Sequence, residues 1–192
     1  MGAISYFCIV KTFKEIDLSF TIETDLLSLR MEATEADVFT LRREPGKVVI
    51  RCPEAKMTLD AARQEWLRKV VREALREQAR LLLPPRLRLW AERSGLSYSR
   101  CFIKSTRSRW GSYSARGNLN LSCYLLLMDG RYVDYTICHE LCHSREMNHG
   151  PRFWALLDGL TDGHARQLNR EMRQTVRRWY DEGDARAGLL CL

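Results

Sequence analysis

The residues whose types and spacing could do chemistry gather in the segment 139–149. Three of the four histidines in the 192-residue chain lie there: His139, His143 and His149. On a helix, His139 and His143 are one turn apart and project from the same face, so two imidazole nitrogens can reach one metal ion. Glu140 is turned by about 100° around the helix axis from its neighbour His139. Its carboxylate can therefore lie beside the metal as a general base and not as a ligand.

The third histidine can join the first two only if the helix ends soon after His143. Six residues beyond His143 is not a whole number of helical turns, so in a continuous helix His149 would point away. The segment 147–151, Met-Asn-His-Gly-Pro, favours a turn because Asn and Gly tolerate left-handed backbone angles and Pro can open the next helix. Three histidine ligands leave a fourth position for water, as in catalytic zinc sites. The alternative is a helix that happens to carry two histidines, with His149 as a surface or capping residue.

Cysteine usage and charge bound the remaining possibilities. Seven cysteines without a Cys-x-x-Cys pair argue against a disulfide framework and indicate a reducing compartment. Cys138 and Cys142 flank the histidines on a neighbouring helix face, where we expect packing, with a thiolate ligand as the alternative. The net charge of +7 favours acidic partners, including nucleic acid, nucleotides or acidic peptides, without deciding among them. We find no transmembrane segment and a poor signal peptide, and expect a cytoplasmic protein.

The elements that must position these residues indicate an α+β fold. In the N-terminal β-rich part, residues 1–55, we expect two strands, over 4–13 and 18–22, followed by a hairpin around Pro45-Gly46. The helical pattern that begins near 58 predicts one helix up to the prolines at 84 and 85 and a second one from there to Gly95. Arginines alternate with glutamates in this region, which indicates a solvated face, with a polyanion-binding face as the alternative.

The second half of the chain, within a domain over 56–182, returns to β character before the metal helix. We expect strands over 99–104 and 118–125, separated by a polar, glycine-bearing segment over 107–117. A strand placed before the metal helix could align an extended substrate by main-chain hydrogen bonds, and plain sheet with a loop is the alternative. After the histidines we expect a short helix from Pro151 to Gly159, a basic amphipathic helix over 162–180 that starts near His164, a surface or capping residue, and a disordered tail over 183–192.

Several segments taken in order carry a resemblance to a known family. They are Arg109-Trp110-Gly111-Ser112, Gly117-Asn118-Leu119-Asn120-Leu121, His139-Glu140-Leu141-x-His143, Asn148-His149 and Pro151-Arg152-Phe153-Trp154. With them the chain resembles the YgjP-like metallopeptidase family, which is related to the SprT-like and other zincin proteases. The resemblance covers roughly residues 37–182 and leaves residues 1–36 outside.

The resemblance implies a zincin-like fold in which a small mixed or antiparallel sheet packs on the active-site helix. It also implies a zinc ion held by His139, His143 and His149, with Glu140 as catalytic base. Two positions depart from the family pattern, Tyr113 and Gly150, where a small residue or Cys and a Ser are usual. The spacing of the histidines also equals that of metzincins, but those need Gly where this chain has Glu146.

Together these features predict a zinc-dependent metallopeptidase that cleaves peptide or protein substrates. For the group that stabilises the tetrahedral oxyanion we consider Arg152, Asn148 and Tyr113. One alternative is a metal-dependent nucleotide phosphohydrolase, because guanidinium groups suit phosphate, although the sequence has no Gly-rich phosphate loop. The other is a nucleic-acid-associated protease module like that of SprT-like relatives.

Overall fold

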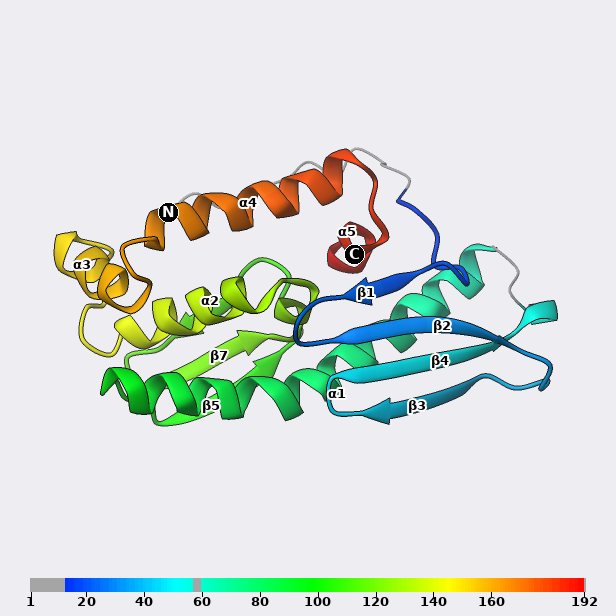
Figure 1. The fold of residues 1–192 in the computed structure, drawn as a ribbon, viewed down its shortest axis with the longest axis horizontal. Helices are drawn as coiled ribbons and strands as arrows, with labels where there is room; N and C mark the ends of the chain where they lie inside the picture. Colours follow the sequence, from blue (N-terminus) through cyan, green and yellow to red (C-terminus); the bar gives the residue numbers. More distant parts are fainter. Residues whose placement is uncertain (1–12, 57–59, 192) are drawn as a thin grey trace.

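The N-terminal part of the computed structural model, which describes residues 13–56 and 60–191, is a four-stranded mixed sheet (Figure 1). Its strand order is β1-β2-β4-β3, with β1 at Thr21–Glu23, β2 at Ser28–Thr34, β3 at Thr40–Glu44 and β4 at Lys47–Pro53, followed by the short 3-10 helix η1 at Glu54–Lys56. β2 and β4 are parallel, and β3 pairs with β4 as the expected hairpin, with Gly46 at φ +76° in the turn. The strand expected over 4–13 falls almost wholly outside the described residues. The strand expected over 18–22 is shifted: β1 begins only at Thr21, and residues 18 and 19 form a turn.

A second, three-stranded sheet has the order β5-β7-β6, with β5 at Arg100–Lys104, β6 at Gly111–Tyr113 and β7 at Asn118–Ser122. β5 runs parallel to β7, and β6 pairs antiparallel to β7 at the edge. The strand expected over 118–125 is too long: after Ser122 the chain forms a buried 3-10 helix, η2, at Cys123–Leu127. The segment expected as a loop contains β6, which is only three residues long and therefore shows no periodicity in sequence.

One long helix, α1 (Ala61–Ser94), passes both sheets, so the expected division into two helices is wrong (Figure 1). Pro84 and Pro85 lie inside it and remove two N–H donors, but the carbonyls that lose them belong to the exposed residues Arg80 and Leu81, where water can replace the donor. The buried face continues across the prolines because Leu83 and Leu87 lie one turn apart and are both fully buried. Packing of this face outweighs the lost hydrogen bonds.

Four further helices complete the fold: α2 (Gly130–Cys142), α3 (Pro151–Leu160), α4 (Ala165–Asp181) and α5 (Ala185–Leu190). The first three agree with the expected helices. The disorder expected after residue 182 is wrong, because Asp184 caps α5 and Leu189 and Leu190 are buried in the core. Figure 1 shows α5 between α4 and β1. The domain boundary near residue 55 stays a prediction.

Helix α2 is held at two points by side chains from other parts of the chain. Asp25, in the turn between β1 and β2, accepts a hydrogen bond from the N–H of Gly130 at the start of α2, at 2.5 Å. Further along, the carboxylate of Asp134 accepts hydrogen bonds from the guanidinium of Arg86 at 2.8 Å and from Trp90 Nε1 at 2.7 Å, both residues of α1. The N-terminal sheet and α1 thus both fix the helix that carries the histidines.

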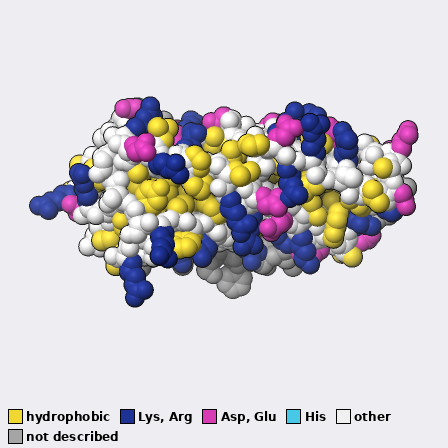
Figure 2. Space-filling view, turned by 90° about the horizontal axis from the view of Figure 1, so that it is seen from below, with side chains coloured by type: hydrophobic (Ala, Val, Ile, Leu, Met, Phe, Trp, Pro, Cys, Tyr) yellow, Lys and Arg dark blue, Asp and Glu magenta, His cyan; other side chains and the backbone are white. Residues whose placement is uncertain are grey.

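Charged side chains cover much of α1, and many are paired with opposite charges. Arg72 lies 2.9 Å from Glu65, and Arg43 of β3 contacts Glu77. In the space-filling view from below, Lys and Arg are interspersed with Asp, Glu and apolar groups (Figure 2). This arrangement favours the solvated face over a polyanion-binding one. Among the described helices, none combines the length and the apolar composition needed to cross a membrane.

Candidate metal centre

The fold brings His139, His143 and His149 together, with one potential ligand atom from each within 4.8 Å of the others. The Nε2 atoms of His139 and His149 are 3.0 Å apart. Two nitrogens bound to one tetrahedral zinc at ordinary bond lengths are about 3.3 Å apart, so the observed separation is close to that of a shared metal. These three residues form the only cluster with metal-ligand geometry that the described residues contain.

The chain folds back after the second histidine, as the spacing requires. Helix α2 ends with His143 as its C-cap, and the next residues form turns in which Arg145 and Glu146 donate to the carbonyl of Cys142 at 3.0 Å. Gly150 then takes an extended conformation as N-cap of α3, and Pro151 occupies its first turn. This reversal directs His149 back toward α2.

The imidazoles of His139 and His143 have lowered pKa values and stay neutral, so each keeps a nitrogen lone pair that can bind a metal ion. Burial, followed by the charges of His143 and His149, lowers the pKa of His139 to about 3. Burial also lowers the pKa of His143. The Nδ1 of His143 lies 3.0 Å from the carbonyl oxygen of Glu146, which fixes the tautomer that leaves Nε2 free for a metal. The Nδ1 of His139 is buried and has no hydrogen-bond partner in the described part of the chain. The donor set therefore suits a divalent metal ion.

Phe153 forms the apolar floor of the cluster. Its ring centroid lies 4.9 Å from that of His139, 4.8 Å from that of His143 and 4.5 Å from that of His149, and the side chain is fully buried. It comes from the first turns of α3, directly after the reversal. One aromatic side chain thus restrains all three imidazole rings by packing.

Glu140 is buried beside the histidines, against the edge strand β6. It is 7% exposed, and burial raises the pKa of its carboxyl to about 8, while the charge of Arg109 acts in the opposite direction. Gly111 of β6 leaves the space that this side chain fills: a Cβ at Gly111 would lie 2.6 Å from Glu140 Cγ and 2.7 Å from its Oε1. The sequence places Gly111 in a motif, but only the fold shows that it makes room for the carboxylate.

Among residues 13–56 and 60–191, no backbone group pairs with the outer edge of β6, next to Glu140. Trp110 accepts a bond from Ser122, and Ser114 donates to Asn118, so residues 110, 112 and 114 use their backbone groups on β7. In an antiparallel pair the intervening residues turn theirs the other way. Gly111 and Tyr113 therefore present N–H and C=O groups to the side of β6 away from β7.

The three residues considered for the oxyanion are not gathered at the cluster by any hydrogen bond. The hydroxyl of Tyr113 donates a hydrogen bond to the carbonyl oxygen of Ser97 at 3.0 Å, so it already has a partner other than a substrate oxyanion. Asn148 and Arg152 are exposed on the reversal and at the start of α3. Arg109, to which the sequence analysis assigns no role, is the charged side chain that acts on Glu140.

The remaining candidates lie apart from the metal cluster. Cys138 and Cys142 are fully buried, and burial raises the pKa of both thiols, that of Cys142 to about 12, which agrees with packing. His164 is exposed at the N-cap of α4, as expected of a surface or capping residue.

Comparison with known proteins gives one match. The model of the family described as YgjP-like, metallopeptidase domain, matches residues 23–175, which is most of the chain. The matched range includes β2 and so begins earlier than the resemblance seen in the sequence. Neither the curated proteins nor the solved structures give a significant match. The α+β architecture and the histidine cluster agree with the family assignment, and the chain belongs to the YgjP-like metallopeptidase domain family.

Proposed function

We propose that the protein is a zinc metallopeptidase in which His139, His143 and His149 hold the metal and Glu140 is the general base. The observation that carries this proposal is the position of Glu140, which is buried beside three converging imidazoles and under an open strand edge. A zinc ion bound there would polarise the scissile carbonyl and lower the pKa of its water toward about 7. Three imidazole ligands would leave a fourth position for that water.

The residues of the chain divide the remaining work. Glu140 takes a proton from the attacking water and delivers it to the leaving amine, a role worth about 10²–10⁴-fold in rate. Its apolar surroundings and raised pKa favour holding that proton between the two transfers. Gly111 and Tyr113 offer their backbone N–H and C=O groups to an extended peptide, which then lies along β6 with its scissile bond next to Glu140.

The direct test is Glu140→Gln, which removes the base and keeps the shape of the side chain. We expect the variant to bind one zinc per chain, measured by elemental analysis, and to lose at least 100-fold in kcat on casein and short peptides. A variant with full activity would refute the assignment. The same assays run with nucleoside triphosphates and with DNA address the phosphohydrolase and nucleic-acid alternatives: turnover of a nucleotide without turnover of any peptide would favour the first, and steeply salt-dependent DNA binding the second.

A further inference from the structure

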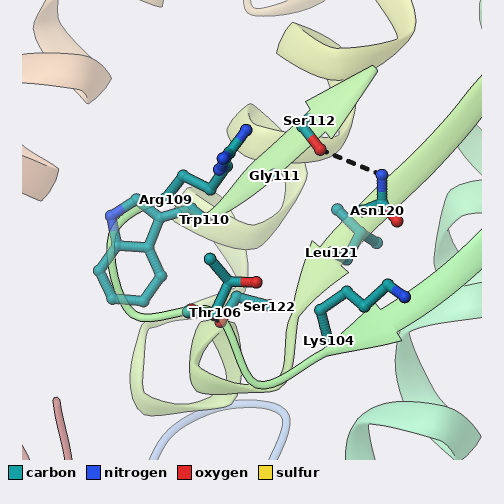
Figure 3. A pocket seen from close by; sticks show the side chains of 9 residues that line it. All are labelled: Lys104, Thr106, Arg109, Trp110, Gly111, Ser112, Asn120, Leu121 and Ser122. Carbon is teal, nitrogen blue, oxygen red and sulfur yellow. Dashed lines mark hydrogen bonds between the residues drawn. The ribbon is translucent and has the colours of Figure 1, made fainter. Parts of the chain in front are cut away.

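A polar pocket of about 230 Å³ lies where the segment between β5 and β6 crosses the ends of β6 and β7 (Figure 3). Two cations line it, Lys104 and Arg109. Hydroxyl and amide groups come from Thr106, Ser112, Asn120 and Ser122, and the lining is completed by Trp110, Gly111 and Leu121. None of the described residues that line it is acidic. The composition is therefore that of a site for an anion.

Neither cation in the pocket forms a contact ion pair among the described residues, although the charge of Arg109 acts on Glu140. Lys104 makes a cation–π contact with Phe102, at 5.3 Å from the ring centroid, but neither Lys104 nor Arg109 forms an ion pair with any residue in 13–56 or 60–191. Some basic side chains of the fold are paired, for example Arg86 with Asp134. The hydrogen bond from Asn120 Nδ2 to Ser112 Oγ, at 3.1 Å, uses the hydroxyl as an acceptor and leaves its proton free to be donated.

The pocket lies within reach of a peptide paired with β6. The missing side chain of Gly111 faces Glu140 on α2, so by alternation Ser112 faces the opposite side of the sheet, toward the pocket. A peptide extended along this edge alternates in the same way, and every second side chain lies on the side of Ser112. Figure 3 shows Arg109 and Asn120 on opposite sides of β6, so Arg109 lies along the free edge where such a peptide would run.

We propose that this pocket is a substrate subsite that binds the carboxylate of an Asp or Glu side chain and so selects acidic peptides. The inference rests on the proposed peptidase function. A guanidinium can hold a carboxylate through two parallel hydrogen bonds, and the ammonium of Lys104, on β5, adds a second positive charge to the same pocket. Arg109 lies two residues before Gly111, whose missing side chain faces Glu140, so an anchored side chain would lie along the same strand edge as that carboxylate.

The test compares peptides that differ in one carboxylate. Eight-residue fluorogenic peptides carry Glu or the uncharged, equally large Gln at each position in turn, and the ratio of kcat/KM for the two is measured. We expect one position at which Glu is preferred roughly 10- to 100-fold, the effect of charge-assisted hydrogen bonds. Arg109→Gln should bring this ratio close to 1, Lys104→Gln should lower it, and Arg109→Lys should restore part of it. Arg100→Gln, four residues before Lys104 on the same exposed face of β5, is the matched control and should keep the ratio.

A binding measurement separates this inference from the proposed function. Labelled Glu and Gln peptides are titrated into the Glu140→Gln protein, loaded with zinc, and followed by fluorescence anisotropy. If the Glu peptide binds selectively and this selectivity depends on Arg109, but the wild-type protein cleaves no peptide, the subsite would be supported and the peptidase function overturned. Equal binding of both peptides, or an equal loss in the Arg109 and Arg100 variants, would overturn the subsite. Tighter binding of ATP or inorganic phosphate than of the Glu peptide, lost in Arg109→Gln, would identify a phosphate site and overturn the carboxylate proposal.

Discussion

Replacing Gly111 with alanine tests how the edge strand and Glu140, the proposed general base, fit together. The added Cβ would lie 2.6 Å from Cγ, 2.7 Å from Oε1 and 2.9 Å from Cδ of Glu140, closer than real Cβ atoms approach other heavy atoms. All three nearest atoms belong to Glu140, and no histidine atom is among them. The substitution should therefore move the carboxylate and leave the metal ligands in place.

The size of the effect follows from the distance to be recovered. To regain ordinary contact the carboxyl group must shift by roughly 1 Å, and a misplacement of that size costs on the order of 100-fold in rate. This loss equals about 2.7 kcal/mol of transition-state stabilisation. The crowding itself should destabilise the fold by about 1–3 kcal/mol. We thus expect a folded, metal-binding protein with about one per cent of the wild-type kcat.

The assay measures kcat on a cleaved peptide, the zinc content, and the free energy of unfolding in urea. Gly159→Ala in α3 is the control, because a Cβ at Gly159 would meet nothing within 4 Å. It should keep the wild-type kcat and zinc content, and its free energy of unfolding should rise by at most about 1 kcal/mol because Ala favours a helix over Gly. Wild-type kcat in Gly111→Ala would refute the reasoning, since Glu140 would then not need the place that the structure gives it. Loss of zinc would show instead that the cluster depends on β6.

The other predictions concern the histidines. His149→Ala should weaken zinc binding by more than roughly 10- to 100-fold, which is the cost of losing only an outer hydrogen-bond partner of a metal ligand. His164→Ala should leave zinc binding unchanged. Competition with a chelator measures both affinities, and an unchanged affinity in His149→Ala would remove His149 from the ligand set. In the metal-free protein, burial lowers the pKa of His139 from 6.5, the ordinary value for histidine, to about 3. Between these pH values the unfolded chain binds the extra proton, so the free energy of unfolding falls as the pH falls. Urea titrations at pH 7 and pH 5 should show a smaller fall for His139→Gln, and an equal fall would contradict the lowered pKa.

The histidine cluster could be predicted from sequence because its information is local. His139 and His143 need only a helix, and His149 needs only the reversal that Asn148, Gly150 and Pro151 indicate. The hairpin around Pro45-Gly46 could be predicted for the same reason, because its turn chemistry lies within the hairpin itself.

The features that sequence did not reveal depend on contacts between distant residues. Pro84 and Pro85 are strong local signals for the end of a helix, but burial of Leu83 and Leu87 on one face outweighs them. The tail forms α5 because Leu189 and Leu190 pack into the core, and a short apolar run in the sequence does not by itself predict this packing. The charge of Arg109 can act on the carboxyl of Glu140 only because the fold places β6 beside α2.

The two halves of the centre differ in how much chain must be organised to build them. Closing the loop between His139 and His149 costs little conformational entropy, whereas the place for Glu140 requires β6 to pair with β7 and then to pack on α2. During folding, metal capture can therefore precede completion of the catalytic pair. If the proposed function holds, a metal-loaded but inactive chain is thus an expected stage of assembly, and formation of the short sheet is the event that places Glu140 beside the histidine cluster.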